Sequence, residues 1–128
     1  MDAASASTAS FAPHPARIGE ARRRVAGACE GLSRDLIEIA QLLTSELVGN
    51  AMEHGKGTIT LTILRQRGFL RVEVGDDGPD RPRLIQSVDV LSGKRGLMLV
   101  EGFADGWGVR SAEDGPGKVV WFALKTPA

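Results

Sequence analysis

The sequence predicts an α+β protein built as a two-layer α/β sandwich, with helices on one face of a mixed, mostly antiparallel sheet. In the first half of the chain apolar residues recur at helical spacing, and after residue 57 they alternate strictly with polar residues, as in strands. Helices therefore cluster early and between strands, an order typical of a sheet covered by helices. The 128 residues suffice for one domain with a substantial core, which we expect over residues 11–126.

The N-terminal part is expected to hold a tail, an edge strand and a first helix. Residues 1–10 are mostly Ala, Ser and Thr with little to bury, so we expect a flexible tail there. A short edge strand is expected to begin at Phe11, and Pro15 suits the first turn of a helix. The apolar stripe of this helix ends at Gly31. Its members are Ile18, Ala21, Val25, Cys29 and Leu32.

The next helix is the most informative segment, and we expect it to begin after Ser33, which suits an N-cap, and to stop at Gly55. Its apolar arc consists of Leu36, Ile39, Ala40, Leu43, Leu47 and Ala51. Glu46, Asn50 and His54 fall on the same arc, and a buried carboxylate or amide is costly without a partner. A divalent cation bound by the Asn50 amide oxygen would offset the cost of burial, and so would a nucleophile that the Glu46 carboxylate orients. Alternatively, both groups bond neighbouring backbone or lie at the wet edge of the arc.

The second half of the chain is expected to form most of the sheet. Thr58–Ile63 and Leu70–Val74 alternate polar and apolar residues around a turn at 66–68, which predicts an antiparallel hairpin. Residues 79–92 have weak periodicity and are expected to form a long functional or mobile loop. Three elements are expected after it: a helix through Leu97, Val100 and Ala104, a strand at Trp107–Val109, and a central strand at Val119–Leu124 that is apolar on both faces.

Composition excludes several classes of protein. The formal net charge is zero, so nothing global indicates binding to nucleic acid or to an anionic membrane. The single cysteine, Cys29, rules out an internal disulfide. No apolar run approaches the roughly 18–20 residues that span a bilayer, and the start of the chain lacks the order of a signal peptide. A cytoplasmic location is therefore the default expectation.

Three polar segments stand at ends of elements that a sandwich could bring together. The first carries Glu46 and Asn50. The second, Asp76-Asp77-Gly78, directly follows a strand, where a carboxylate can accept hydrogen bonds from an exocyclic amine and a glycine allows a flat ring to approach. Turn chemistry alone is the alternative for this segment. The third, Gly93-Lys94-Arg95-Gly96, opens a helix whose free N–H groups favour phosphate, although it is neither a Walker A nor a GxGxxG motif.

In order and spacing these segments resemble the N, G1 and G2 boxes of the Bergerat-fold (GHKL) ATPases, which have a histidine kinase-like ATPase domain. The resemblance covers about Phe11 to Leu124 and is to stand-alone bacterial ATP-binding proteins related to anti-sigma factor serine kinases. The matching runs are Glu46–His54, Val74–Gly78 and Arg95–Val100, followed by Ala104–Val109.

This resemblance implies ATP and Mg²⁺ as cofactors and a role for each matching residue. In the N box, Asn50 corresponds to the Mg²⁺ ligand and Glu46 to the general base. In the G1 box, Asp76 corresponds to the aspartate that bonds the adenine amino group, with Gly78 beside the base. The role of His54, at the end of the N box, stays open.

The resemblance also implies a phosphate site at the start of the last helix. The usual Gly-Arg-Gly-Leu of this subgroup reads Lys94-Arg95-Gly96-Leu97, so Gly96 is expected against the phosphates, with Lys94 or Arg95 as cations. Residues 79–95 correspond to an ATP lid. Val119 stands where a threonine near the adenine is common.

As a function, the resemblance implies a serine/threonine kinase of GHKL type that phosphorylates a small antagonist protein and sequesters a sigma factor. Apolar residues near Phe11 are compatible with a homodimer, as in relatives. The competing interpretation is a catalytically weak or inactive binding module that sequesters a regulator without phosphoryl transfer. The altered G2 approach and Val119 favour this module, whereas the intact pair of Glu46 and Asn50 argues against it.

Overall fold

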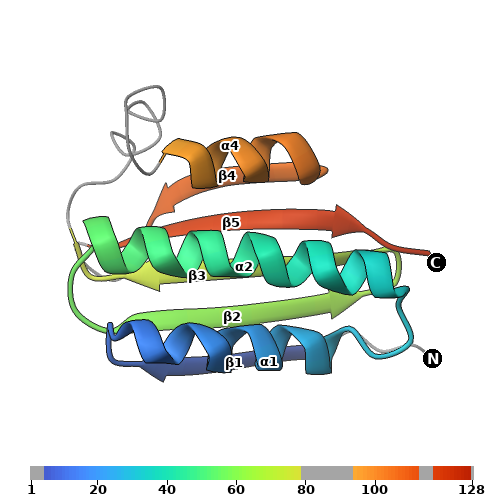
Figure 1. The fold of residues 1–128 in the computed structure, drawn as a ribbon, viewed down its shortest axis with the longest axis horizontal. Coiled ribbons are helices and arrows are strands. Elements are labelled where there is room, and N and C mark those ends of the chain that lie inside the picture. Colours follow the sequence, from blue (N-terminus) through green and yellow to red (C-terminus); the bar gives the residue numbers. More distant parts are fainter. Residues whose placement is uncertain (1–4, 79–93, 113–116, 128) are drawn as a thin grey trace.

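The computed structural model describes residues 5–78, 94–112 and 117–127, without the side chains of residues 54 and 94–98. The chain alternates between helical and extended segments in the expected order (Figure 1). The elements are β1 Ser5–Phe11, a 3-10 turn η1 Pro15–Arg17, α1 Ile18–Ala28, α2 Arg34–His54, β2 Ile59–Gln66, β3 Phe69–Asp76, α4 Lys94–Phe103, β4 Gly106–Ser111 and β5 Lys118–Lys125.

The described strands form one five-stranded sheet in the order β1-β2-β3-β5-β4. All four pairings within it are antiparallel. Figure 1 shows α1, α2 and α4 lying side by side over one face of this sheet, with α2 in the middle. The predicted two-layer α+β sandwich is therefore confirmed, and β5 is an interior strand as expected.

The core lies between the sheet and the helices, because alternate residues of β2, β3 and β5 are buried. The helices meet this layer with the expected apolar stripes, and Cys29 is buried among them as a free thiol. The buried apolar side chains of these strands are Ile59, Leu61, Ile63, Leu70, Val72, Val74, Val120, Phe122 and Leu124.

The boundaries of α2 follow the sequence signals. The Ser33 side chain accepts a hydrogen bond from the Leu36 backbone N–H at 3.1 Å, which satisfies one of the free donors of the first turn. The helix ends at Gly55, whose N–H donates to the Ala51 carbonyl. Helix α2 therefore runs over the sheet from one end to the other, and its last turn lies near the end of β3 (Figure 1).

The N-terminal strand begins earlier than expected. Residues Ser5–Ser10, which the sequence suggested as part of a tail, pair with β2, and the edge strand ends rather than begins at Phe11. Phe11 is the one fully buried residue of β1. Hydroxyl contacts from Thr8 to Thr62 (3.3 Å) and from Ser10 to Thr60 (3.4 Å) accompany the backbone pairing. Backbone bonds therefore hold a segment that has little apolar surface.

The sheet face away from the helices carries a charged network. Glu73 accepts hydrogen bonds from Arg71 at 2.8 Å and Arg110 at 3.0 Å, and the Arg71 guanidinium lies 4.0 Å from the centre of the Trp121 ring. Burial raises the pKa of Glu73, but the hydrogen bonds from Arg110 and Arg71 outweigh it and leave that pKa below its usual value. In the described part of the chain, no helix has the length and hydropathy to cross a membrane.

Candidate functional site

Three of the predicted site segments meet at one end of the sandwich. The last turn of α2, the end of β3 and the beginning of α4 lie at the left of Figure 1, together with the start of β5. α2 packs against β3, β5 and α4. The three boxes, far apart in sequence, therefore converge as the sequence suggested.

The two polar residues of the α2 arc differ in burial. Asn50 is buried, with 9% of its surface exposed, and its Nδ2 atom has no hydrogen-bond partner among the described residues. Glu46, one turn earlier, is partly exposed and fits the alternative of a group at the wet edge of the arc. The argument that a buried polar group needs an external partner therefore applies to Asn50 and not to Glu46.

Asp76 is the last residue of β3, and its carboxylate is fully engaged by the protein. Oδ1 accepts hydrogen bonds from the backbone N–H of Gly78 at 2.7 Å and of Lys56 at 3.4 Å. Oδ2 lies 2.7 Å from Nζ of Lys118, and each of these two side chains is 1% exposed. The predicted adenine-binding acid thus forms a buried ion pair.

Lys118 was missed by the sequence reasoning, which started the last strand at Val119. The lysine stands directly opposite Asp76 in the register of β3 and β5. Period-two alternation would have revealed its orientation, since Lys118 shares the buried face of β5 with Val120 and Phe122. A fully buried lysine is rare in proteins unless it is paired with an acid. Here Lys118 and Asp76 form this pair where β3 ends and β5 begins.

Glycines make this close packing around Asp76 feasible. A Cβ at Gly55 would lie 2.5 Å from Asp76 Oδ2 and 2.6 Å from the Ala51 carbonyl oxygen. A Cβ at Gly78 would lie 3.0 Å from Asp76 Oδ1, and one at Gly117 would overlap the Asp76 backbone oxygen. Gly55 therefore does more than end α2, because it makes room for the carboxylate.

The residue after Asp76 ties the strand end to the loop that follows α2. The Asp77 N–H donates to the Lys56 carbonyl at 2.8 Å, and its Oδ2 accepts from the Thr58 N–H at 3.2 Å. These bonds are long-range, and the turn chemistry named as the alternative for this segment is instead the local bond from the Gly78 N–H to Asp76 Oδ1. The loop and the strand end are consequently joined by hydrogen bonds next to the ion pair.

The G2 segment forms the first turn of α4, which begins at Lys94. Lys94, Arg95, Gly96 and Leu97 therefore occupy a helix N-terminus, as predicted, where backbone N–H groups favour an anion. Their side chains, and that of His54, lie outside the described residues, as do residues 79–93 of the expected lid.

The described side chains of the candidate site match the usual ligands of Mg²⁺ only in part. The described residues contain no group of three or more His, Cys, Asp or Glu side chains that could hold a metal ion. Mg²⁺, however, usually takes one or two protein ligands and completes its shell with water and substrate phosphates. Asn50 could supply such a single ligand through its amide oxygen, whereas its unpartnered Nδ2 is a donor that would bond an acceptor such as a phosphate or water oxygen.

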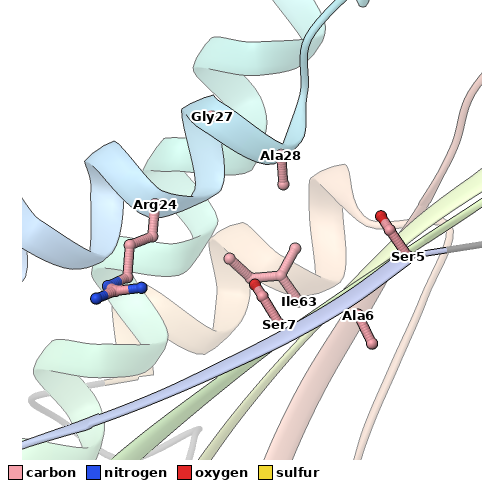
Figure 2. A pocket seen from close by; sticks show the side chains of 7 residues that line it. All are labelled: Ser5, Ala6, Ser7, Arg24, Gly27, Ala28 and Ile63. Carbon is pink, nitrogen blue, oxygen red and sulfur yellow. The ribbon is translucent and has the colours of Figure 1, made fainter.

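A separate cavity of about 320 Å³ lies between β1 and α1, at the other end of the sandwich. Figure 2 shows Arg24 and Ala28 of α1 reaching toward the sheet, with Ile63 below them. Arg24 is already paired with Glu20 at 3.3 Å. None of the predicted site residues lines this cavity, so it is not part of the candidate site.

A search of curated proteins found no match. A family model described as a histidine kinase-like ATPase domain matches residues 11–124, nearly the full length. This match agrees with the two-layer sandwich and with the three boxes at one end of it. The chain belongs to the histidine kinase-like ATPase domain family, whose GHKL-type members bind ATP.

Proposed function

We propose that this domain is an ATP-binding regulatory protein that works with Mg²⁺ in the manner of anti-sigma factor serine/threonine kinases. The observation that supports this most strongly is the buried Asn50 amide, which has no Nδ2 partner in the described chain and belongs to the C-terminal part of α2, the helix whose end lies near the end of β3 and the start of α4 in Figure 1. An orphaned N–H donor is expensive in a protein interior and calls for an acceptor oxygen from outside, such as that of a phosphate or its water shell, while the amide oxygen of the same side chain is the atom that could ligate Mg²⁺.

The chemistry would divide among the residues as follows. Asn50 would hold Mg²⁺, and the ion would supply positive charge to offset the charge on the phosphate oxygens during transfer. The partly exposed Glu46 accepts the proton of a serine or threonine hydroxyl on a small antagonist protein. That hydroxyl oxygen bonds to the γ-phosphorus while the bond to the β-phosphate breaks and ADP leaves. The N–H groups of the first turn of α4 hold phosphate oxygens.

Regulation would follow from competition between two protein partners. The antagonist protein is the phosphoacceptor, and a sigma factor binds the same domain and is sequestered by it. The exposure of Glu46 supports this proposal, because a base that serves a protein substrate must reach the surface.

A second candidate function is a binding module that sequesters a regulator without phosphoryl transfer. The ion pair of Asp76 with Lys118 favours it, because this acid is already satisfied by the protein. In the module, the pair would serve as a structural replacement for a bound base. The two candidates share the fold and differ in whether nucleotide is bound and consumed.

Calorimetric titration with ATP, with and without Mg²⁺, tests the proposal on the wild type, Asn50→Ala and Glu38→Ala. Glu38 is exposed on the same helix and serves as the matched control. We expect Mg²⁺ to strengthen ATP binding in the wild type and the control but not in Asn50→Ala. Mg²⁺ dependence that survives in Asn50→Ala would contradict the ligand assignment.

Labelling separates the kinase from the module. The domain is incubated with ATP labelled on the γ-phosphate and a candidate antagonist protein, and label on the antagonist identifies the kinase. Glu46→Gln should abolish this labelling while keeping ATP affinity. Binding of the antagonist without label, at saturating ATP, would favour the module.

A further inference from the structure

A lysine ammonium lies on Asp76, the acid that the family resemblance assigns to the adenine amino group. We propose that Lys118 determines the base specificity of the nucleotide site, by occupying on Asp76 the position that the 6-amino group of adenine would take. Lys118 then weakens ATP binding and reduces the preference for a 6-amino over a 6-keto purine. This inference depends on the proposed nucleotide binding.

The first step is the occupancy of the Asp76 carboxylate. A carboxylate has about four acceptor positions on its two oxygens. Oδ1 already takes two backbone N–H groups, at 2.7 and 3.4 Å, and Oδ2 takes the Lys118 ammonium at 2.7 Å. Because the carboxylate is 1% exposed, an amine from a base can reach Oδ2 only if the ammonium moves aside or shares it.

The second step is the enclosure of this pair. Gly55, Gly78 and Gly117 lie so close to Asp76 that a Cβ on any of them would crowd it. The backbone of these three glycines therefore packs against Asp76, whereas the ion pair with Asp76 is the only polar contact of Lys118 Nζ among the described residues. Because the lysine side chain also has more rotatable bonds than the aspartate, it is the part of the pair better able to move when a base arrives.

The third step is the spare capacity of the ammonium. An ammonium has three hydrogens to donate. Apart from the ion pair with Asp76, Lys118 Nζ has no hydrogen-bond partner among the described residues, although the side chain is fully buried. Two donors are thus left for an acceptor from outside, and the 6-keto oxygen of a purine is such an acceptor.

These steps together predict the selectivity of the site. A lone carboxylate accepts from a 6-amino group and repels a 6-keto oxygen. The pair of Asp76 and Lys118 offers an acceptor and a donor side by side, so both kinds of purine find a partner. Wild-type protein should therefore discriminate poorly between ATP and ITP, which differ in the 6-substituent of the base and in the proton on the neighbouring N1.

The test is the affinity of the Lys118→Met variant for ATP and for ITP, measured by calorimetry in the presence of Mg²⁺. We expect ATP to bind about tenfold or more tighter than to wild type, because the amine now satisfies a carboxylate that lacks its cation. ITP should bind no tighter, so the ratio of the two affinities should rise by a similar factor. Lys125→Met, at the exposed end of the same strand, should change neither affinity.

A merely structural lysine would leave the ratio of ATP to ITP affinity unchanged, and that result in a folded Lys118→Met variant would overturn the inference. If this variant does not fold, Lys118→Ala, which also removes the donor but leaves room for water beside Asp76, should shift the ratio in the same direction. An unshifted ratio in Lys118→Ala would equally contradict the inference.

The outcome also separates this inference from the proposed function. Wild type that binds ATP, with a variant that binds it no tighter, contradicts the inference alone. Absence of nucleotide binding in both proteins contradicts the proposed function and the inference with it. A variant that binds ATP when wild type does not would support the inference and favour the module as the wild-type function.

Discussion

Replacing Lys118 by methionine should lower the stability of the nucleotide-free domain by about 3 kcal/mol. Removing one partner of a buried ion pair leaves an uncompensated charge, which generally costs about 3–5 kcal/mol. The lower end applies here because Asp76 Oδ1 keeps two backbone hydrogen bonds. A domain of this size has a total stability of about 5–15 kcal/mol, so the variant should remain folded.

The assay is urea unfolding at neutral pH followed by tryptophan fluorescence, with the Asp76→Asn/Lys118→Met double variant for comparison. The double variant carries no buried charge, and we expect it to recover part of the loss, since replacing both partners of such a pair is often nearly neutral. Lys125→Met should stay within about 0.5 kcal/mol of wild type. A loss below about 1 kcal/mol for Lys118→Met, or a double variant less stable than the single one, would refute the reasoning.

Two further predictions concern the surroundings of the site and the open face of the sheet. Gly55→Ala should destabilise the domain by about 2 kcal/mol, because its Cβ would lie 2.5 Å from Asp76 Oδ2. A Cβ added at Gly49 would have no atom within 4 Å, so Gly49→Ala should stabilise the domain by up to about 1 kcal/mol. Equal effects of the two substitutions on the free energy of unfolding in urea would contradict this prediction. The Glu73 pKa is lowered in the folded state, so its ionised form stabilises the fold above its usual pKa of 4.5, and this contribution is lost as the pH falls through the lowered value. Glu73→Gln should therefore be less stable than wild type by up to about 1 kcal/mol at pH 7 and equal to it in acid, and a constant difference across a pH series of unfolding curves would exclude this explanation.

Local patterns in the sequence were enough to predict most of the fold. The strict alternation of Thr58–Ile63 and Leu70–Val74 predicted the hairpin, because burial of one face imposes period two on the residues. The cap at Ser33 and the stop at Gly55 predicted the bounds of α2 to within a residue. Most of β1 escaped prediction, since only its last residue, Phe11, was expected in a strand, and pairing by backbone groups leaves no mark on the run of Ala, Ser and Thr before it.

The candidate site could be predicted only in outline. The order of the three boxes predicted which segments converge, and the fold brings them to one end of the sandwich. The partner of Asp76 could not be read in this way, since it depends on the register between β3 and β5, a pairing between residues distant in sequence. A lysine at the start of a strand also looks like a solvated strand end, which hid the buried cation that pairs with Asp76.

Stability and nucleotide affinity are linked through the same contact at Asp76. A bond that Asp76 makes in the free protein and gives up when nucleotide binds stabilises the free protein and weakens nucleotide binding by the same free energy. Each 1.4 kcal/mol corresponds to about a factor of ten in the dissociation constant. Lys118→Met should therefore move the two quantities in opposite directions. A stability loss together with a gain in ATP affinity means that Asp76 contacts the base. A stability loss alone means that the pair serves to join the ends of β3 and β5, and that the domain is better understood as a module for protein binding.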